Sequence, residues 1–133
     1  MLYQADCLII RKEDIAREEM YLLFQRNKLI ACVAVNEDQD EAYRDASWSY
    51  TQGRVAVIHR LCVHPEVQGF GHGKRILKAA EDQIQKMGYS IIRLDAFSQN
   101  VAAIRMYESF GYHLAGEVHF RKGLFYLFEK AYC

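Results

Sequence analysis

The sequence contains few residues that interrupt regular structure and shows no excess of charge of either sign. It has one proline, and 17 basic side chains balance 17 acidic ones, so the formal net charge is zero. Because the basic residues are not gathered into one run, we expect no nucleic acid to be held by bulk electrostatics. No apolar run approaches the length of a membrane span, and Met1 is not followed by the basic segment and apolar core of a signal peptide. We therefore expect a cytoplasmic protein with no membrane partner.

Cysteines at a spacing typical of metal sites or redox motifs are also missing. The four cysteines, Cys7, Cys32, Cys62 and Cys133, include no pair separated by two residues. Three of them lie in or beside apolar runs, where a thiol usually packs as a small hydrophobic group. The histidines show no metal-ligand spacing either. We therefore expect reduced thiols and no bound metal.

Apolar residues, by contrast, are plentiful. They make up 51% of the 133 residues, which is enough to build one hydrophobic core, whereas the chain is too short for a second one. We therefore expect a single domain that spans residues 1–133.

The apolar residues recur with the periods of strands and helices. Runs of apolar and β-branched residues predict strands at 21–24, 29–35, 55–63, 91–96, 112–120 and 124–129. Helical spacing predicts one helix from Gly73 to Gly88 and a second from its N-cap Asn100 to Gly111. Residues 12–20 are expected to form a short helix at best, and residues 36–49 a surface loop. This order predicts an α/β fold with a mixed, mostly antiparallel central sheet flanked by helices.

The most informative motif is Gln-Gly-Phe-Gly-His-Gly at residues 68–73, between the strand at 55–63 and a helix. Positive φ values at Gly69, Gly71 and Gly73 would aim backbone N–H groups into one concavity, and the first helical turn would add more. Such a junction is typical of a pyrophosphate site. The segment has neither the spacing of a Walker A loop nor the Gly-x-Gly-x-x-Gly spacing of a dinucleotide fingerprint, which excludes both of these phosphate loops. For the glycines taken alone, an ordinary tight turn is the alternative.

Three segments together resemble the GCN5-related N-acetyltransferase (GNAT) superfamily. They are Arg60-Leu-Cys-Val-His-Pro65, the Gln68-x-x-Gly71-x-Gly73 turn and Asn100-Val-Ala-Ala-Ile-Arg-Met-Tyr107-Glu-Ser-Phe-Gly-Tyr112. With the strand before them, they cover residues 55–112 in the order and spacing of the family. The resemblance implies a GNAT-like fold, shortened at the N-terminus. It also implies an enzyme that moves acetyl from acetyl-CoA to a primary amine of a small molecule or peptide, by direct attack in a ternary complex.

The resemblance further implies which residues bind acetyl-CoA. Backbone groups of Leu61, Cys62 and Val63 would pair with the pantetheine arm, and Asn100 would bond to it from the second helix. The pyrophosphate would lie on the amides of Gln68, Gly69, Phe70, Gly71, His72, Gly73 and Lys74. Lys74 or Arg75 could also meet a phosphate, although a solvated first helical turn explains these two residues equally well.

Tyr107 and His59 are the expected catalytic residues. In the family, the tyrosine at the position of Tyr107 points at the thioester sulfur; the alternative is a core aromatic residue beside Phe110. The family places its general base on the strand at 55–63, but this chain has Val55 where histone-type members carry glutamate. His59 shares a face with Val55 by alternation and is the best replacement. A strand histidine that only bonds to its neighbours is an equal alternative.

The acceptor amine is not identified by the sequence. The loop before the central strand carries five acids, Glu37, Asp38, Asp40, Glu41 and Asp45, with Tyr43, Trp48 and Tyr50 among them. Such a cluster would attract a cationic amine, although a solvated surface loop is the commoner case. The family begins with a further strand and helix, and only about 20 residues precede the first expected hairpin here. One expectation is therefore a homodimer in which a second subunit completes the site or covers the exposed edge of the sheet. A non-catalytic acyl-CoA-binding sensor or regulatory module is the alternative function.

Overall fold

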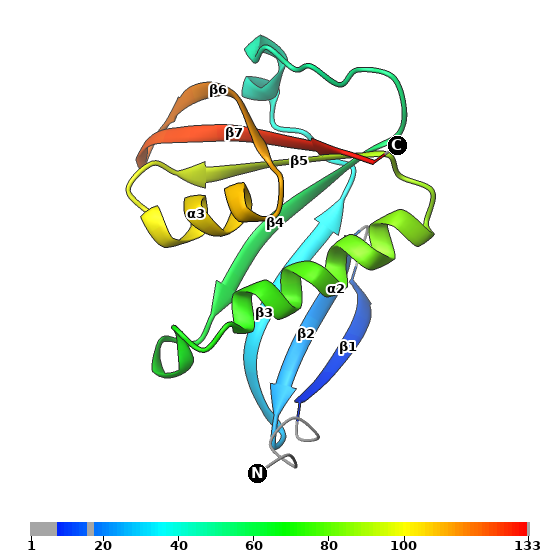
Figure 1. Ribbon diagram of the computed structural model, residues 1–133, viewed down its shortest axis with the longest axis vertical. Coiled ribbons are helices and arrows are strands. Elements are labelled where there is room, and N and C mark those ends of the chain that lie inside the picture. The colour runs from blue at the N-terminus through cyan, green and yellow to red at the C-terminus, as the bar shows by residue number, and fades with distance from the viewer. Residues whose placement is uncertain (1–7, 16–17, 133) are drawn as a thin grey trace. The chain divides into compact units, whose positions relative to one another are not determined.

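The computed structural model describes residues 8–15 and 18–132, which form two compact units (Figure 1). The first unit contains the described residues up to Asn36 and the segment Ile58–Met87. The second contains Glu37–Val57 and residues 88–132. Strand β4 (Val55–Val63) therefore contributes its first three residues to the second unit and the rest to the first. Cys7 and Cys133 lie outside the described residues.

The strands of the first unit precede β4 and pair as antiparallel hairpins. They are β1 (Leu8–Ile15), β2 (Glu18–Gln25) and β3 (Lys28–Asn36), and β2 pairs with both others. Arg26 and Asn27 form the turn between β2 and β3 with φ of 51° and 67°, the left-handed pair that suits a two-residue hairpin. The short helix expected within residues 12–20 was wrong, because the described residues of this segment belong to β1 and β2.

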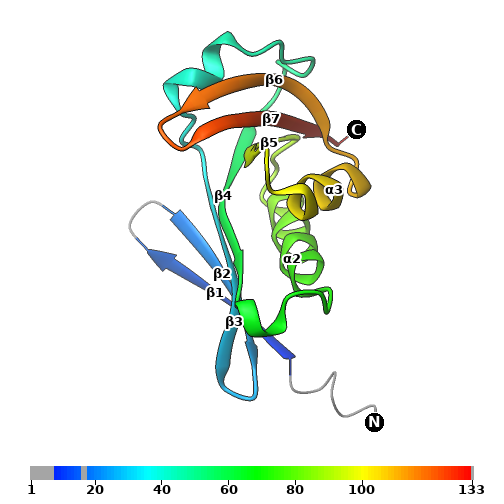
Figure 2. The same cartoon turned by 90° about the vertical axis from the view of Figure 1, so that its left-hand side faces the viewer.

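Helix α2 (His72–Lys86) packs along β2 and β3 (Figures 1 and 2). Ile76, Leu77, Ala80 and Ile84 recur at helical spacing and are fully buried, as the amphipathic pattern predicted. Burial of each large aliphatic side chain contributes about 1.5–3 kcal/mol, so this stripe fixes which face of the helix meets the sheet. The short 3-10 helix η2 (Pro65–Val67) and the glycine-rich turn connect β4 to α2.

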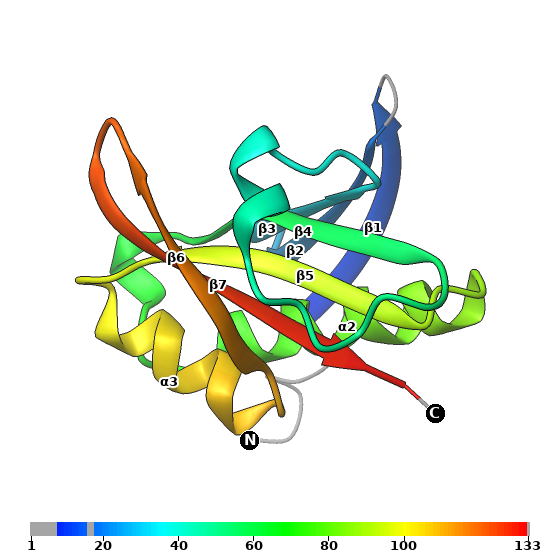
Figure 3. The ribbon, with the colours of Figure 1, turned by 90° about the horizontal axis from the view of Figure 1, so that it is seen from above.

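The second unit has elements on both faces of its sheet. Its strands after β4 are β5 (Ile91–Phe97), β6 (His113–Phe120) and β7 (Gly123–Ala131). Helix α3 (Val101–Ser109) and the short 3-10 helix η1 (Glu41–Asp45) lie on opposite sides of these strands (Figure 3). Tyr107 of α3 packs against Phe128, whereas Tyr43 of η1 packs against Leu127, whose side chain points to the other face.

The strands follow the order β1-β2-β3-β4-β5-β7-β6 in one seven-stranded sheet. The pair β4–β5 is parallel, and its ladder joins Val55–Val57 to residues 91–93. Arg60 has φ of 53°, so the extended backbone of β4 is interrupted directly before Leu61. The expected mixed sheet with flanking helices is confirmed. Within the described residues, none of the helices has the length and hydropathy needed to cross a membrane.

Candidate active site

The segment between β4 and α2 is a tight turn with an open backbone. His64 Nδ1 accepts from the Glu66 amide at 3.1 Å and caps η2, and Gln68 Nε2 donates to the Val63 carbonyl at 3.1 Å. Gly69 and Gly71 have φ of 89° and 81°, the left-handed values expected from the sequence. A methyl group at Gly69 would meet no other atom within 4 Å. The space beside this glycine can therefore hold a bound group.

Gly73 does not share this conformation. It is the second residue of α2, which begins at His72 with Gly71 as its N-cap. The expectation of a third glycine with positive φ was wrong, because the helix begins one residue earlier than the apolar pattern suggested. Since Gly71 has no side chain to cap the helix, the N–H groups of the first turn are left for another acceptor, which is the geometry that binds anions.

Arg75 braces this turn from the first turn of the helix. Its Nη1 donates to the Phe70 carbonyl at 2.8 Å and lies 3.1 Å from His72 Nδ1. Burial, and then the charge of Arg75, lower the pKa of His72. His72 is therefore neutral at pH 7, and because Nδ1 faces a donor, its proton is assigned to Nε2. Lys74, which directly precedes Arg75, is exposed.

The residues expected to meet the pantetheine lie at the end of β4, beyond its ladder with β5. Leu61 and Val63 are half-buried and Cys62 is exposed, with a free thiol. Immediately afterwards the His64 amide donates to the Ile30 carbonyl of β3 at 2.7 Å. The structure thus holds residues 61–74 together in the first unit, as one continuous backbone from strand to helix.

Asn100 and Tyr107 belong to the second unit. Asn100 is the N-cap of α3 as predicted, since its Oδ1 accepts from the Ala103 amide at 3.2 Å. Tyr107 is buried, and its ring packs against Tyr112 and Phe128 at centroid distances of 5.7 and 6.3 Å. Burial, and then the charge of Asp95, raise the pKa of Tyr107 to about 12. The phenol therefore keeps its proton near neutral pH and can only donate a hydrogen bond to an incoming anion.

His59 is bonded to its neighbours in the first unit. Its Nε2 lies 2.6 Å from Asn36 Oδ1, and Asn36 Nδ2 donates to Glu18 Oε1 at 3.2 Å. Because the Asn36 amide donates through Nδ2, its oxygen accepts, and the His59 proton is assigned to Nε2. A hydrogen bond from Arg60 lowers the pKa of the Glu18 carboxylate, so Glu18, the last member of this series of hydrogen bonds, stays negatively charged. A base at His59 would have to act through Nδ1.

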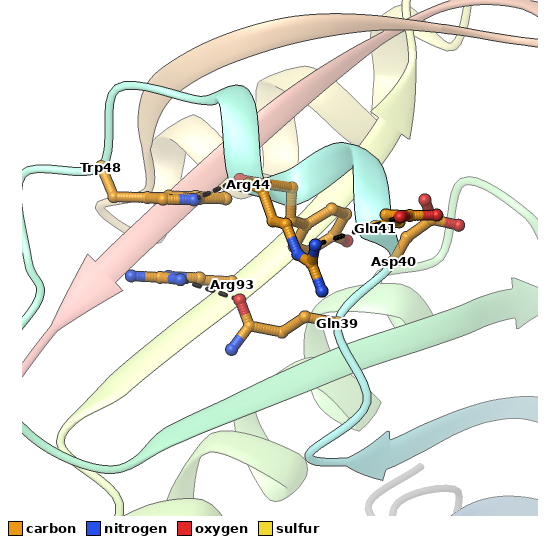
Figure 4. A pocket seen from close by; sticks show the side chains of 7 residues that line it. Gln39, Asp40, Glu41, Arg44, Trp48 and Arg93 are labelled. Atoms are coloured by element: carbon orange, nitrogen blue, oxygen red, sulfur yellow. Dashed lines mark hydrogen bonds and ion pairs between the residues drawn. The ribbon is translucent and has the colours of Figure 1, made fainter.

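A hollow that was not predicted from the sequence lies in the second unit, on the face covered by η1 (Figure 4). Its volume is about 470 Å³, and its lining residues are Gln39, Asp40, Glu41, Tyr43, Arg44, Trp48 and Arg93. The Tyr43 hydroxyl donates to Asp95 Oδ2 at 2.6 Å, so the hollow adjoins a carboxylate of β5. Arg93 and Asp95 alternate along an otherwise apolar strand. Two charges on one face of a buried strand were the signal that could have found this region.

Most acidic side chains of the loop between β3 and β4 form contacts that stabilise the loop itself. Glu37 accepts from the Tyr89 hydroxyl at 2.9 Å and pairs with Arg54 at 3.7 Å. Asp40 caps η1 by accepting from the Ala42 amide, and Glu41 lies 4.0 Å from Arg44. These contacts support the interpretation of a solvated, structural loop for the acids, while the aromatic residues among them, Tyr43 and Trp48, line the hollow. No group of three or more His, Cys, Asp or Glu side chains in the described ranges could hold a metal ion.

Comparison with known proteins gives several relatives whose names specify acetyl transfer. The chain is 31% identical over 70 residues to the L-methionine sulfoximine/L-methionine sulfone acetyltransferase of Salmonella typhimurium, covering 53% of this chain and 41% of the relative. It is 37% identical over 70 residues to the spermine/spermidine N(1)-acetyltransferase of Bacillus subtilis, covering 51% of this chain and 45% of the relative. The matches thus span less than half the length of these two relatives.

The fold matches as well. The Salmonella typhimurium protein yncA, solved with its cofactor acetyl-CoA, superposes with a TM-score of 0.66 at 18% sequence identity, over 86% of this chain and 64% of that one. The model of the acetyltransferase (GNAT) family matches residues 2–112, which is most of the chain. The chain therefore belongs to the acetyltransferase (GNAT) family.

Proposed function

We propose that this protein is an acetyl-CoA-dependent N-acetyltransferase whose primary-amine acceptor attacks the thioester directly in a ternary complex. The observation that carries the proposal is the turn from Gln68 to His72. It combines two left-handed glycines, open space beside Gly69 and an uncapped helix start. A pyrophosphate needs converging N–H donors, and left-handed glycines before an uncapped helix start are an arrangement that favours them. Family membership and the acetyl-CoA bound to yncA favour this cofactor over other diphosphates.

The remaining cofactor contacts follow the family pattern. The amides of residues 68–74 would hold the pyrophosphate, and backbone groups of residues 61–63 would pair with the pantetheine as an added strand does. Asn100 already uses Oδ1 for its cap, so its amide nitrogen is the group left to bond the arm. One N–H near Cys62 or Val63 would stabilise the developing oxyanion. Loss of such a donor costs about 3–4 kcal/mol in enzymes where it has been measured.

Tyr107 would hold the leaving sulfur. A thiol of ordinary pKa, about 8.5, leaves near neutrality as a thiolate with modest help. A phenol of pKa about 12 is fully protonated near neutral pH. It can therefore donate a hydrogen bond to the sulfur without first taking up a proton. Within the described residues no hydrogen bond engages the Tyr107 hydroxyl, which supports this role.

The acceptor amine must lose a proton before it attacks. A lysine-type amine of pKa about 10.4 costs about 4 kcal/mol to neutralise near pH 7.4, whereas an α-amine of pKa about 7.8 costs under about 1 kcal/mol. His59 could take this proton through Nδ1, with its ring fixed by Asn36. A base matters more for the first kind of amine, so the need for His59 depends on the acceptor.

Three further expectations belong to this proposal. We expect a single domain over residues 1–133, and the free thiols of Cys32 and Cys62 support a reducing, cytoplasmic setting. Strand β1 stands first in the sheet order and exposes Ile9 and Ile10, which supports a homodimer formed through this edge. Sedimentation velocity across a concentration series tests the dimer, which a constant monomer mass would exclude.

A thiol-release assay tests the function itself. The protein is mixed with acetyl-CoA and a panel of amino acids, peptides with free N-termini, polyamines and aminoglycosides. We expect free CoA to appear with at least one amine class, and the acetylated amine to appear in equal amount by mass spectrometry. Tight acetyl-CoA binding by calorimetry without release for any acceptor would instead indicate the sensor. Absence of binding would contradict both functions.

A further inference from the structure

We propose that the hollow of the second unit binds the carboxylate of an α-amino acid, or of a similar amine with a neighbouring carboxylate, as the acetyl acceptor. This inference names the acceptor class and rests on the proposed acetyl transfer. It is carried by Arg93, whose environment in the hollow leaves one of its hydrogen-bond donors unused.

Arg93 is a buried cation held in a fixed orientation. It is 8% exposed, its guanidinium lies 4.2 Å from the centroid of the Trp48 ring, and it donates to Gln39 Oε1 at 2.8 Å and to the Tyr50 carbonyl at 2.9 Å. Figure 4 shows the guanidinium stacked beneath the indole, with Gln39 on its other side. A planar, pre-oriented guanidinium is the side chain best suited to bind a carboxylate through two parallel hydrogen bonds.

The protein does not satisfy this cation fully. Arg93 Nε is buried and has no hydrogen-bond partner among the described residues. The buried carboxylate of Glu129, which faces Arg93 across the β5–β7 ladder, already accepts from the Ser49 and Tyr50 amides at 2.8 and 3.0 Å. A small anion in the hollow would bond to the remaining hydrogens of Nη1 and Nη2, and at this buried guanidinium it would gain more than at a solvated arginine.

Among the charged side chains that line the hollow, Arg93 is the buried one. Asp40 and Glu41 also line it, but Glu41 and its partner Arg44 are 88% and 81% exposed in their side chains, and Asp40 is exposed and occupied as a helix cap. Exposed charges are screened by water and salt, whereas a buried charge is screened much less. Arg93 is therefore the lining charge that water and salt screen least, and its outside neighbours are the carboxylates of Glu129 and Asp95.

The hollow also adjoins the carboxylate of Asp95 on β5. Tyr43 lines it and donates to Asp95, and the charge of Asp95 contributes to the raised pKa of Tyr107. An acceptor whose carboxylate lies on Arg93 would have its ammonium group drawn toward the negative charge of Asp95.

The single tryptophan provides a direct readout of binding. Trp48 is the only tryptophan of the chain and stacks on Arg93, so its fluorescence reports occupation of the hollow without any need for turnover. The full chain is titrated, without acetyl-CoA, with L-leucine, L-leucinamide, isopentylamine and spermidine. We expect a saturable change with L-leucine and at least tenfold weaker binding of the other three, since they lack the carboxylate.

Three variants test whether the fluorescence response to L-leucine depends on Arg93. Arg93→Lys removes the planar fork and should abolish the L-leucine response, with circular dichroism as the folding check. Arg44→Gln alters the exposed rim and should weaken binding less than tenfold. Arg121→Gln changes an exposed arginine of the turn between β6 and β7 and should leave binding within twofold. If Arg93→Lys fails to fold, the ligand series on the unaltered protein still tests whether binding requires the carboxylate.

The outcomes separate this inference from the proposed function. Equal responses to L-leucine and L-leucinamide, a response to spermidine alone, or no response to any ligand would each overturn the carboxylate site. Thiol release that prefers spermidine would do the same while supporting acetyl transfer. A carboxylate-dependent fluorescence change without thiol release for any amine would keep the site and refute the enzyme.

Discussion

Tyr107 combines a ring that belongs to the core with a hydroxyl that we assign to the chemistry. Tyr107→Phe keeps the packing against Tyr112 and Phe128 and removes only the donor. We expect kcat for acetyl transfer to fall about 10²-fold or more, the lower end of what positioned proton donors contribute, while the Kd for acetyl-CoA changes less than about twofold. Thiol-release kinetics and calorimetry measure the two quantities.

Its neighbour Tyr112 is the matched control for that variant. Tyr112→Phe alters a second buried tyrosine in contact with the same ring, so it reproduces any general loss of packing. We expect nearly unchanged kcat for this control. Equal turnover in the Tyr107→Phe variant and the unaltered protein would remove Tyr107 from the mechanism.

At the scale of elements, the segment that contains η1 is fixed by one buried carboxylate. Glu129 is 1% exposed and accepts from the amides of Ser49 and Tyr50. Glu129→Gln turns part of this acceptor into a donor that faces two N–H groups, which should cost about 1–3 kcal/mol of unfolding free energy. Urea denaturation measures that loss, and hydrogen exchange should show faster exchange of these two amides.

Glu117→Gln is the control, because Glu117 is an exposed carboxylate on the adjacent strand β6. It should change stability by less than about 0.5 kcal/mol. Unchanged exchange at Ser49 and Tyr50 in the Glu129 variant would show that other contacts hold the segment. The Trp48 indole, which donates to the Tyr43 carbonyl at 2.7 Å, would then be the next candidate.

Elements with a strong local period were predictable from sequence, and the others depended on distant partners. Helix α2 and strand β4 carry clear apolar patterns, and both were found within two residues of their ends. Strand β1 was missed because residues 11–14 are all charged. What stabilises it is non-local: Lys12 pairs with Glu19 at 3.4 Å and Arg11 lies over the Phe24 ring at 4.4 Å.

In the candidate site, too, local features were predictable from sequence and contacts between distant residues were not. The glycine turn and the cap at Asn100 follow from short-range rules, so the sequence located both. The hollow joins η1 to β5 across about 50 residues of sequence, and no local pattern relates Tyr43 to Asp95. Gly73 was misassigned because a glycine at the start of a helix fits the turn and the helix equally well.

For the whole molecule, buried tyrosines predict a loss of stability at alkaline pH. Burial raises the pKa of Tyr21, Tyr43 and Tyr107 above the ordinary value of 10. A raised native pKa stabilises the fold fully below pH 10, and this stabilisation is lost as pH rises further, because only the unfolded chain then releases the proton. For Tyr107, with a pKa of about 12, the loss amounts to about 2–3 kcal/mol.

Urea denaturation from about pH 8 to pH 11 measures this loss. The free energy of unfolding should be flat below about pH 9.5 and fall above pH 10. Tyr43→Phe removes one of the three groups and should make the fall shallower, whatever its effect at neutral pH. A curve for this variant parallel to that of the unaltered protein would mean that Tyr43 does not contribute.

The central claim is that the backbone of the glycine turn binds the pyrophosphate of acetyl-CoA, and a pair of glycine variants tests it most directly. Gly69 and Gly88 have nearly equal φ, 89° and 88°, so Gly→Ala imposes similar strain of about 1–2 kcal/mol at each. Gly69 lies in the turn, whereas Gly88 lies just after α2. Calorimetry should show Gly69→Ala weakening acetyl-CoA binding at least tenfold and Gly88→Ala less than twofold. Equal affinities of the two variants would contradict the account.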